Sequence, residues 1–187
     1  MVDYLSDDIK KAVDVLRRGG IIAYPVESIF GLGCDPYNEQ AVKKILKIKK
    51  RTIKCGFVLV ACNWEQIYTM ISPITQEQFD IIDKTWPGNN TWLFPKKPDL
   101  PMWITGDSQR VALRIPDHPV PKLLAQLFHN PVISTSVNIH GETPCKTALE
   151  VQRKFNAHVD YIIHRDVGHY KSASTIRDVV TLQVVRH

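Results

Sequence analysis

The feature that most constrains this chain is a regular alternation of short apolar runs with helical patterns. Residues 21–24 and 57–61 are apolar at nearly every position, which is typical of strands buried on both faces. Between them, Asn38 precedes a stretch whose apolar residues recur at helical spacing. The alternation continues over 187 residues, about one domain length. It predicts a single α/β domain, residues 1–187, built on a largely parallel or mixed sheet covered by helices.

Local signals place the remaining elements. Ser6 is expected to cap a first helix that ends at Gly19-Gly20, and a glycine-containing loop is expected from Pro25 to Cys34. Further helices are predicted after Asn38, after Asn63, after the Thr75/Gln78 capping box, over 119–128, and after the Thr147/Glu150 capping box. Further strands are predicted over 91–94, 110–115, 132–135, 161–163, 175–180 and 182–185.

Charge and composition narrow the classes of function. The net charge of +5 and the pI of about 9.0 favour anionic partners without choosing among them. No apolar run approaches the ~20 residues of a membrane span, and the start is acidic rather than signal-like, so a cytoplasmic protein without membrane contact is expected. P-loop, dinucleotide-binding and nucleophile-elbow motifs are absent from the sequence, as is any metal-ligand spacing.

Polar side chains follow the predicted strands. Glu27-Ser28 comes after the first strand, and Ser134 to Asn138 runs off a later one. Lys49 to Arg51 ends the second helix. Open α/β sheets bind ligands at the carboxyl ends of their strands, so these residues predict a site for an anionic small molecule.

Several segments, in order, resemble one known family. They are Ala23–Asp35 (family pattern YPTET-x-YGLG), Lys49–Arg51 (K-x-R), Trp86–Thr91 (WPG-x-x-T), Val111–Arg114 (A-x-R), Ser134–Gly141 (STSAN-x-SG) and Ser174–Ile176 (late P-S-T-I). Together they resemble the YrdC/TsaC family of threonylcarbamoyl-AMP synthases, from about Ile21 to Arg186. The resemblance implies a twisted sheet with helices around a basic cavity.

The resemblance also implies a reaction. Members of that family join L-threonine, bicarbonate and ATP into L-threonylcarbamoyl-AMP and pyrophosphate. The product serves threonylcarbamoyl modification of the adenosine next to the tRNA anticodon, and separate transferase machinery completes that modification. Mg²⁺ is expected to accompany ATP, with no protein ligand that the sequence identifies.

Site roles carry over by position. L-Threonine is expected to contact Ser28, Arg114, Ser136 and Ser174. ATP is expected to contact Lys49, Arg51, Asn138, Lys146 and Arg186, with Lys49 and Arg51 as the catalytic cations. Lys49 and Arg51 are two residues apart, so both reach one ligand only if the helix ends by Arg51 and the backbone turns there.

Other interpretations remain open at this stage. The serines and Asn138 also suit turns, Arg114 suits a solvated strand edge, and the basic residues near Lys49 suit a helix C-terminus. The chain departs from the family pattern at Val26, Thr52, Cys55, Asn89-Asn90 and His140. An RNA-binding module for double-stranded RNA or tRNA and an inactive scaffold homologue are therefore the alternative functions.

Overall fold

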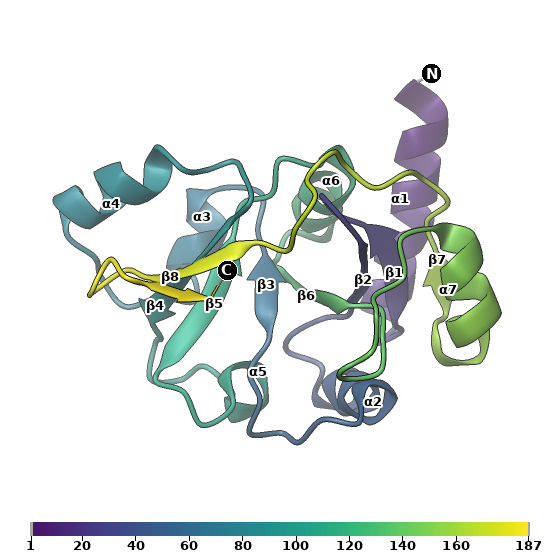
Figure 1. The fold of residues 1–187 in the computed structure, drawn as a ribbon, viewed down its shortest axis with the longest axis horizontal. Helices are drawn as coiled ribbons and strands as arrows, with labels where there is room; N and C mark the ends of the chain where they lie inside the picture. The colour runs from purple at the N-terminus through teal and green to yellow at the C-terminus, as the bar shows by residue number, and fades with distance from the viewer. Residues whose placement is uncertain (1, 187) are drawn as a thin grey trace.

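A mixed sheet of nine strands runs through the computed structural model, which describes residues 2–186 and the side chains of residues 7–186. The strands lie in the order β7-β1-β2-β6-β3-β5-β4-β8-β9 (Figure 1). Their bounds are β1 Ile22–Pro25, β2 Phe30–Gly33, β3 Val58–Val60, β4 Asn90–Pro95, β5 Arg110–Arg114, β6 Val132–Ser136, β7 Tyr161–Ile162, β8 Thr175–Asp178 and β9 Val184–Arg186. The α/β class with a mixed sheet is confirmed.

Strand directions alternate irregularly across the sheet. The parallel pairs are β1–β7, β3–β5 and β4–β8. The antiparallel pairs are β1–β2, β2–β6, β3–β6, β4–β5 and β8–β9. Because neighbouring strands point in different directions, their carboxyl ends do not gather at one edge. This geometry decides where the site lies.

Helices cover the sheet on both faces. They are α1 Val2–Arg17, α2 Glu39–Lys49, α3 Trp64–Tyr68, α4 Gln76–Asp83, α5 Met102–Thr105, α6 Pro119–Phe128 and α7 Ala148–Phe155, followed by the 3-10 helix η1 Asn156–His158. Helices α1 and α6 lie together behind the sheet in Figure 1. Side chains of β1 alternate between two cores: Ile22 and Tyr24 pack with α1 and α6, and Ala23 packs with α2.

Most helix signals in the sequence act as expected. Asn38 Oδ1 accepts the Ala41 N–H at 3.0 Å, and Thr75 and Gln78 form the reciprocal capping box. The Thr147 hydroxyl caps α7, but the Glu150 carboxylate accepts the N–H of Lys146 instead of that of Thr147, so the second capping box is wrong in that half. Helix α1 already begins at Val2, which places Ser6 inside it rather than at its N-cap.

Strand β2 corrects the expected loop between Pro25 and Cys34. Phe30–Gly33 pairs with β1 through a tight hairpin, and glycine, which is depleted in strands, hid it from the sequence pattern. A Cβ at Gly33 would lie 2.7 Å from the Tyr24 ring and 3.0 Å from the Ile133 carbonyl oxygen. Glycine is therefore required here by the close approach of neighbouring strands. The short helix α5 was also not predicted.

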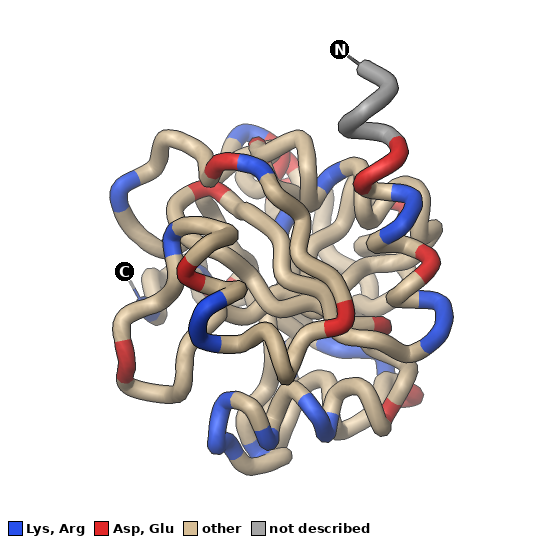
Figure 2. The backbone as a smooth tube through the Cα atoms, turned by 90° about the vertical axis from the view of Figure 1, so that its right-hand side faces the viewer, with Lys and Arg blue, Asp and Glu red and all other residues tan. Residues whose placement is uncertain are grey.

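Charged residues are spread unevenly over the backbone. In Figure 2, Lys and Arg gather at the lower end of the molecule, where α2 lies, and mix with acidic residues elsewhere. The exposed side of α2 carries Lys43, Lys44 and Lys47, and Lys43 is paired with Glu39 at 2.7 Å. The buried Lys49 points the other way, toward the sheet. None of the described helices is both long and apolar enough to cross a membrane.

Candidate functional site

A cavity of about 530 Å³ lies over one face of the sheet. Its floor includes a row of residues in cross-strand register: Ser134, Val58, Ala112 and Leu93. The sequence predicted a site at the carboxyl ends of strands, whereas the cavity spans the sheet face. The difference follows from the mixed strand directions. Arg114 on β5 and Ser136 on β6 lie toward opposite ends of β3, the strand between them.

The cavity brings together all of the predicted site residues except Lys146. Its lining includes Ser28, Lys49, Arg51, Arg114, Ser136, Asn138, Ser174 and Arg186. Lys146 is exposed, just before the cap of α7, and lies outside the lining. Two charged residues that the sequence analysis gave no role, Glu27 and Arg110, join the lining.

The end of α2 sets the directions of Lys49 and Arg51. Lys50 adopts a left-handed conformation (φ 50°), and the Arg51 N–H donates to the Leu46 carbonyl at 2.9 Å. The helix thus ends at Lys49 and the backbone turns before Arg51. The condition derived from the sequence for both side chains to reach one ligand is confirmed.

Lys49 holds the end of β6 through its ammonium group. Nζ lies 2.6 Å from Ser136 O, 2.6 Å from Asn138 Oδ1 and 3.1 Å from Asn138 O. The Ser136 hydroxyl donates to Asn138 Oδ1 at 2.6 Å, and Asn138 Nδ2 donates to Glu142 O at 2.6 Å. Burial, and next the charge of Arg51, lower the pKa of Lys49 to about 8. Lys49 therefore organises the polar wall of the cavity and adds a positive charge to it.

Arg51 is held more loosely. Its Nη2 donates to the Gly56 carbonyl at 3.0 Å, and its guanidinium carbon lies 5.4 Å from the Phe57 ring centroid. The side chain is half-buried and lines the cavity. Hydrogen bonds from Arg51 and Thr52 lower the pKa of the neighbouring Cys55 thiol. A planar cation with uncommitted N–H groups suits phosphate oxygens.

Glu27 and Arg114 form a buried ion pair in the cavity wall. Arg114 Nη2 donates to Glu27 Oε1 and also lies 3.3 Å from Gly88 O. The same Glu27 oxygen accepts the Asp117 N–H at 3.2 Å. Arg114 is 7% exposed, so the solvated-edge interpretation of this arginine is wrong. The sequence analysis noted Glu27 beside Ser28 after the first strand. It assigned Glu27 no function, because a cavity lined by cations was expected.

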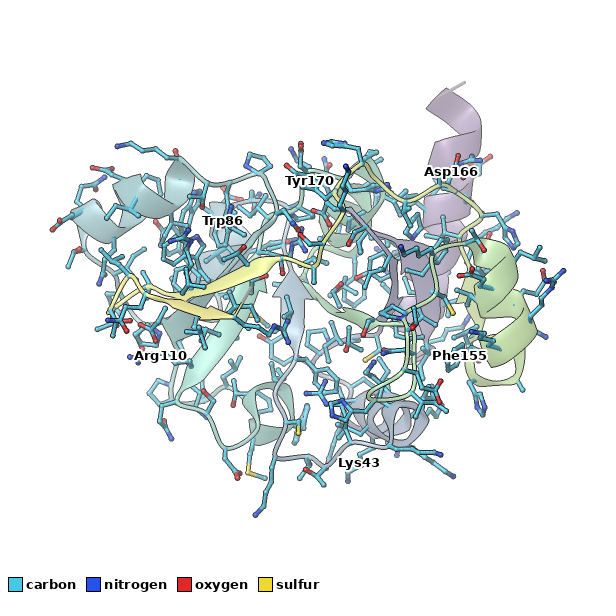
Figure 3. The ribbon with its side chains drawn as sticks, viewed as in Figure 1. Lys43, Trp86, Arg110, Phe155, Asp166 and Tyr170 are labelled. Carbon is cyan, nitrogen blue, oxygen red and sulfur yellow. The ribbon has the colours of Figure 1, made fainter. Side chains whose placement is uncertain are left out.

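A loop that contains Gly168 and Tyr170 holds the backbone of Val26 and Glu27 in place. The segment that carries Asp166 and Tyr170 crosses the upper side of the molecule in Figure 3. The Gly168 N–H donates to Val26 O at 2.9 Å and the Tyr170 N–H donates to Glu27 O at 3.2 Å. Glu27 is therefore held at both its side chain and its main chain.

The C-terminal hairpin closes another side of the cavity. Ser174 precedes β8, and its hydroxyl lies 2.8 Å from that of Thr91. Arg110 on β5, labelled in Figure 3, pairs with Asp178 on β8 at 3.0 Å. Arg186 on β9 lines the cavity. This wall of the cavity is formed by β8 and β9, which follow α2 and β6 much later in the chain.

The departures from the family pattern lie at the site or beside it. Val26, Asn89 and His140 are in the cavity lining. The backbone N–H of His140 donates to the Lys49 carbonyl at 3.2 Å, so this position supports the end of α2 whatever its side chain. Thr52 and Cys55 both follow Arg51 in the chain, with their Oγ1 and Sγ atoms 3.9 Å apart.

In the part of the chain that the structure describes, no metal site built from protein side chains is found. Within residues 2–186, no three His, Cys, Asp or Glu side chains are grouped so that they could hold a metal ion. The residues present therefore do not fit a Mg²⁺ site made by the protein itself.

Comparison with known families decides the assignment. A model of the Sua5/YciO/YrdC family, described as "Telomere recombination", matches residues 14–187. The chain belongs to the Sua5/YciO/YrdC family. The resemblance read from the motifs is thereby confirmed.

Two relatives match the chain over its whole length. It is 42% identical over 186 residues to a threonylcarbamoyl-AMP synthase of Coxiella burnetii (strain RSA 493), covering 100% of each chain. It is 41% identical over 187 residues to that of Cellvibrio japonicus, covering 100% of this chain and 99% of the relative.

Solved Sua5 and YciO structures share the fold. P. abyssi Sua5 complexed with L-threonine matches with a TM-score of 0.85 and 30% identity over 91% of this chain, which spans 50% of the P. abyssi chain. E. coli YciO matches with a TM-score of 0.83 and 26% identity, covering 96% of this chain and 88% of that one.

Proposed function

We propose that this chain is a threonylcarbamoyl-AMP synthase, an enzyme of the nucleotidyltransferase type. It joins L-threonine, bicarbonate and ATP into L-threonylcarbamoyl-AMP, releasing pyrophosphate and water. The observation that carries the proposal is the full-length match to relatives of that name. The cavity supports it, because one space of about 530 Å³ is lined by the side chains that the two larger substrates need.

The amino-acid end of the cavity is assigned to Ser28, Arg114, Ser136 and Ser174. A guanidinium matches the geometry of a carboxylate, and small hydroxyls suit the amine, hydroxyl and carboxylate of L-threonine. Glu27 neutralises part of the charge of Arg114 and fixes its orientation. Support for an amino acid here comes also from the P. abyssi Sua5 structure, which was solved complexed with L-threonine.

The nucleotide end is assigned to Lys49, Arg51, Asn138 and Arg186, with Lys146 as an outer contact. Arg51 supplies charge-assisted hydrogen bonds to phosphate oxygens. Lys49 supplies positive charge close by and holds Asn138 in place. Lys146, exposed outside the lining, reaches only a ligand that extends beyond the cavity.

The chemistry needs positioning and charge more than a nucleophile from the protein. Bicarbonate takes up a proton and loses water to give CO₂, and the neutral amine of threonine attacks this CO₂ and releases a proton. An oxygen of the resulting carbamate then attacks the α-phosphorus of ATP. The bond from that phosphorus to the β-phosphate bridging oxygen breaks, and pyrophosphate leaves. Because carbamate and phosphate are both anions, fixed cations at Lys49 and Arg51 lower the barrier by offsetting their repulsion.

The product fits a second step on tRNA. The mixed anhydride of L-threonylcarbamoyl-AMP is an activated acyl donor, and we assign its transfer to the adenosine next to the anticodon to separate transferase proteins. Direct contact of this chain with tRNA is a further proposal that rests on its basic charge alone.

Pyrophosphate release tests the function directly. Purified protein is given ATP, bicarbonate and L-threonine with Mg²⁺, and pyrophosphate is followed with each substrate omitted in turn. Release that requires all three substrates supports the synthase. Salt-sensitive binding of double-stranded RNA without threonine-dependent release would favour the RNA-binding module instead. Absence of both activities would favour the scaffold homologue.

A further inference from the structure

Two hydroxyl groups from adjacent strands meet beneath the wall of the cavity. Thr91 on β4 is 0% exposed, and Ser174, just before β8, is 8% exposed and lines the cavity. Their oxygen atoms are 2.8 Å apart, a normal distance for a hydrogen bond between hydroxyls. Thr91 itself does not reach the cavity lining.

The direction of this hydrogen bond follows from what else each hydroxyl can reach. Among the described residues, Thr91 Oγ1 has no hydrogen-bond partner, in a side chain or in the backbone, apart from Ser174 Oγ. A buried hydroxyl proton without an acceptor costs free energy, so Thr91 must donate and Ser174 must accept. The proton of Ser174 is then left over. Since Ser174 lines the cavity, its O–H is available to a ligand there.

The backbone around Ser174 leaves the hydroxyl little other freedom. Asn89 Nδ2 donates to Ser172 O and to Ala173 O, both at 3.3 Å. The Thr175 N–H donates to Asn89 O at 3.1 Å, and β4 and β8 then continue as a parallel pair. The start of β4 therefore holds residues 172–175 in place. The Ser174 hydroxyl can still rotate, and the hydrogen bond from Thr91 orients it.

We propose that Thr91 is a positioning residue that makes Ser174 a hydrogen-bond donor toward an oxygen atom of the amino-acid substrate. The proposal rests on the proposed function for the identity of that substrate. An O–H aimed into the cavity suits a carboxylate or hydroxyl oxygen of threonine, which accepts. Thr91 thereby affects amino-acid affinity without touching the amino acid.

The experiment compares four variants with the wild type. They are Thr91→Val, which removes the hydroxyl at nearly constant volume, Thr91→Ser, which keeps it, Ser174→Ala, and the double variant Thr91→Val/Ser174→Ala. L-Threonine binding is measured by calorimetry, the KM values for threonine and ATP are taken from pyrophosphate release, and stability is taken from thermal unfolding. Calorimetry reports on Thr91 even if the protein binds threonine without turning it over, which separates this proposal from the proposed function.

Thr91→Val is expected to weaken threonine binding about two- to tenfold, the range of one net hydrogen bond, while the KM for ATP stays unchanged. Thr91→Ser should bind threonine within about twofold of the wild type, because it keeps the donor. The double variant should bind threonine no more weakly than Ser174→Ala, since Thr91 acts through Ser174.

Thermal unfolding tests the direction of the hydrogen bond. Ser174→Ala leaves the Thr91 proton without an acceptor, so its Tm should fall, and adding Thr91→Val should raise the Tm again because the orphaned hydroxyl is removed. Additive losses of threonine affinity in the double variant would overturn the proposal. A rise in the KM for ATP alone, or equal losses in Thr91→Ser and Thr91→Val, would also overturn it.

Discussion

The guanidinium of Arg51 makes one hydrogen bond within the protein, and it also lines the cavity where a ligand would bind. One nitrogen is bound to the Gly56 carbonyl, and the rest of the guanidinium lines the cavity. Arg51→Ala should lower threonine-dependent pyrophosphate release by roughly ten- to a hundredfold, the effect of one charge-assisted hydrogen bond used in the transition state. Arg51→Lys should restore only part of this activity, because the planar fork is lost.

The matched control for Arg51 is Lys47→Ala, which removes an exposed cation from the same end of α2. It should leave turnover within about twofold, since exposed charges contribute little. A fully active Arg51→Ala would remove the phosphate role from this residue. Loss of folding in Arg51→Ala would instead make the contacts with Gly56 and Phe57 its main role.

Glu27 is predicted to matter for stability as well as for substrate. Glu27→Ala leaves Arg114 buried without its partner, and breaking a buried ion pair in this way costs about 3–5 kcal/mol. Adding Arg114→Met removes the orphaned charge and should recover much of the free energy of unfolding while threonine binding stays lost. Urea unfolding and threonine calorimetry on the single and double variants check this. A double variant less stable than Glu27→Ala would contradict it.

At this scale, roles were predicted for residues that match the family motifs by position. Arg114 and the serines were assigned to the amino acid in that way, and their side-chain chemistry agrees with it. Glu27 and Thr91 stood in the quoted motifs, yet their roles depend on partners 87 and 83 residues away along the chain. No local pattern specifies such partners.

At the scale of elements, Lys49 joins the end of α2 to the end of β6, and this link depends on pH. The pKa of Lys49 is lowered from 10.5 to about 8, chiefly by burial. As pH rises through 8, the folded protein loses an ammonium that the phosphates need, so turnover should fall. Between pH 8 and 10.5 the unfolded chain binds more protons, so the contribution of Lys49 to the free energy of unfolding increases with pH.

Lys49→Met tests both the fall in turnover and the rise in stability that are expected as pH increases. Its remaining activity should lack the decline near pH 8, and its stability should lack the rise between pH 8 and 10.5 relative to the wild type. Rate profiles and urea unfolding across pH 7–10 measure the two. An unchanged decline in Lys49→Met would assign it to another group.

Element boundaries were predictable where a side chain caps a helix. Asn38 and Thr75 do so, and their helices begin where expected. Strand β2 was missed because Gly31 and Gly33, which suit close strand packing, look like loop residues in a sequence. The helical pattern of residues 9–16 predicted α1 but not its start at Val2. Val2 and Leu5 continue the same spacing, and the expected Ser6 cap placed the start too late.

At the scale of the whole molecule, the cavity connects distant parts of the sheet. Its lining comes from strands β2, β3, β4, β5, β6, β8 and β9 and from the end of α2. A ligand that fills it binds only the folded state, and at a hundred times its Kd should stabilise that state by about 2.7 kcal/mol. Thermal unfolding with L-threonine and a non-hydrolysable ATP analogue measures this, and Arg51→Ala should reduce the nucleotide part. Equal shifts in Arg51→Ala and the wild type would contradict it.

The fold class was predictable because hydrophobic periodicity reports burial. The location of the site was not, because periodicity does not report which strands are neighbours or which way they run. Placing β6 between β2 and β3, both antiparallel to it, moves the site from a strand edge onto the sheet face. The predicted residues nevertheless converge, since motif resemblance identifies residues independently of strand order.

The order of strands also bears on synthesis at the ribosome. Strand β1 pairs with β7, joining Ile22 to Tyr161, and β4 pairs with β8, joining Asn90 to Thr175. Such distant pairings form late and slowly. A nascent chain that has emerged only as far as β6 lacks the wall that contains Ser174 and Arg186. The unfinished polypeptide therefore lacks one wall of the cavity, and we expect it to consume ATP only once β8 and β9 have emerged.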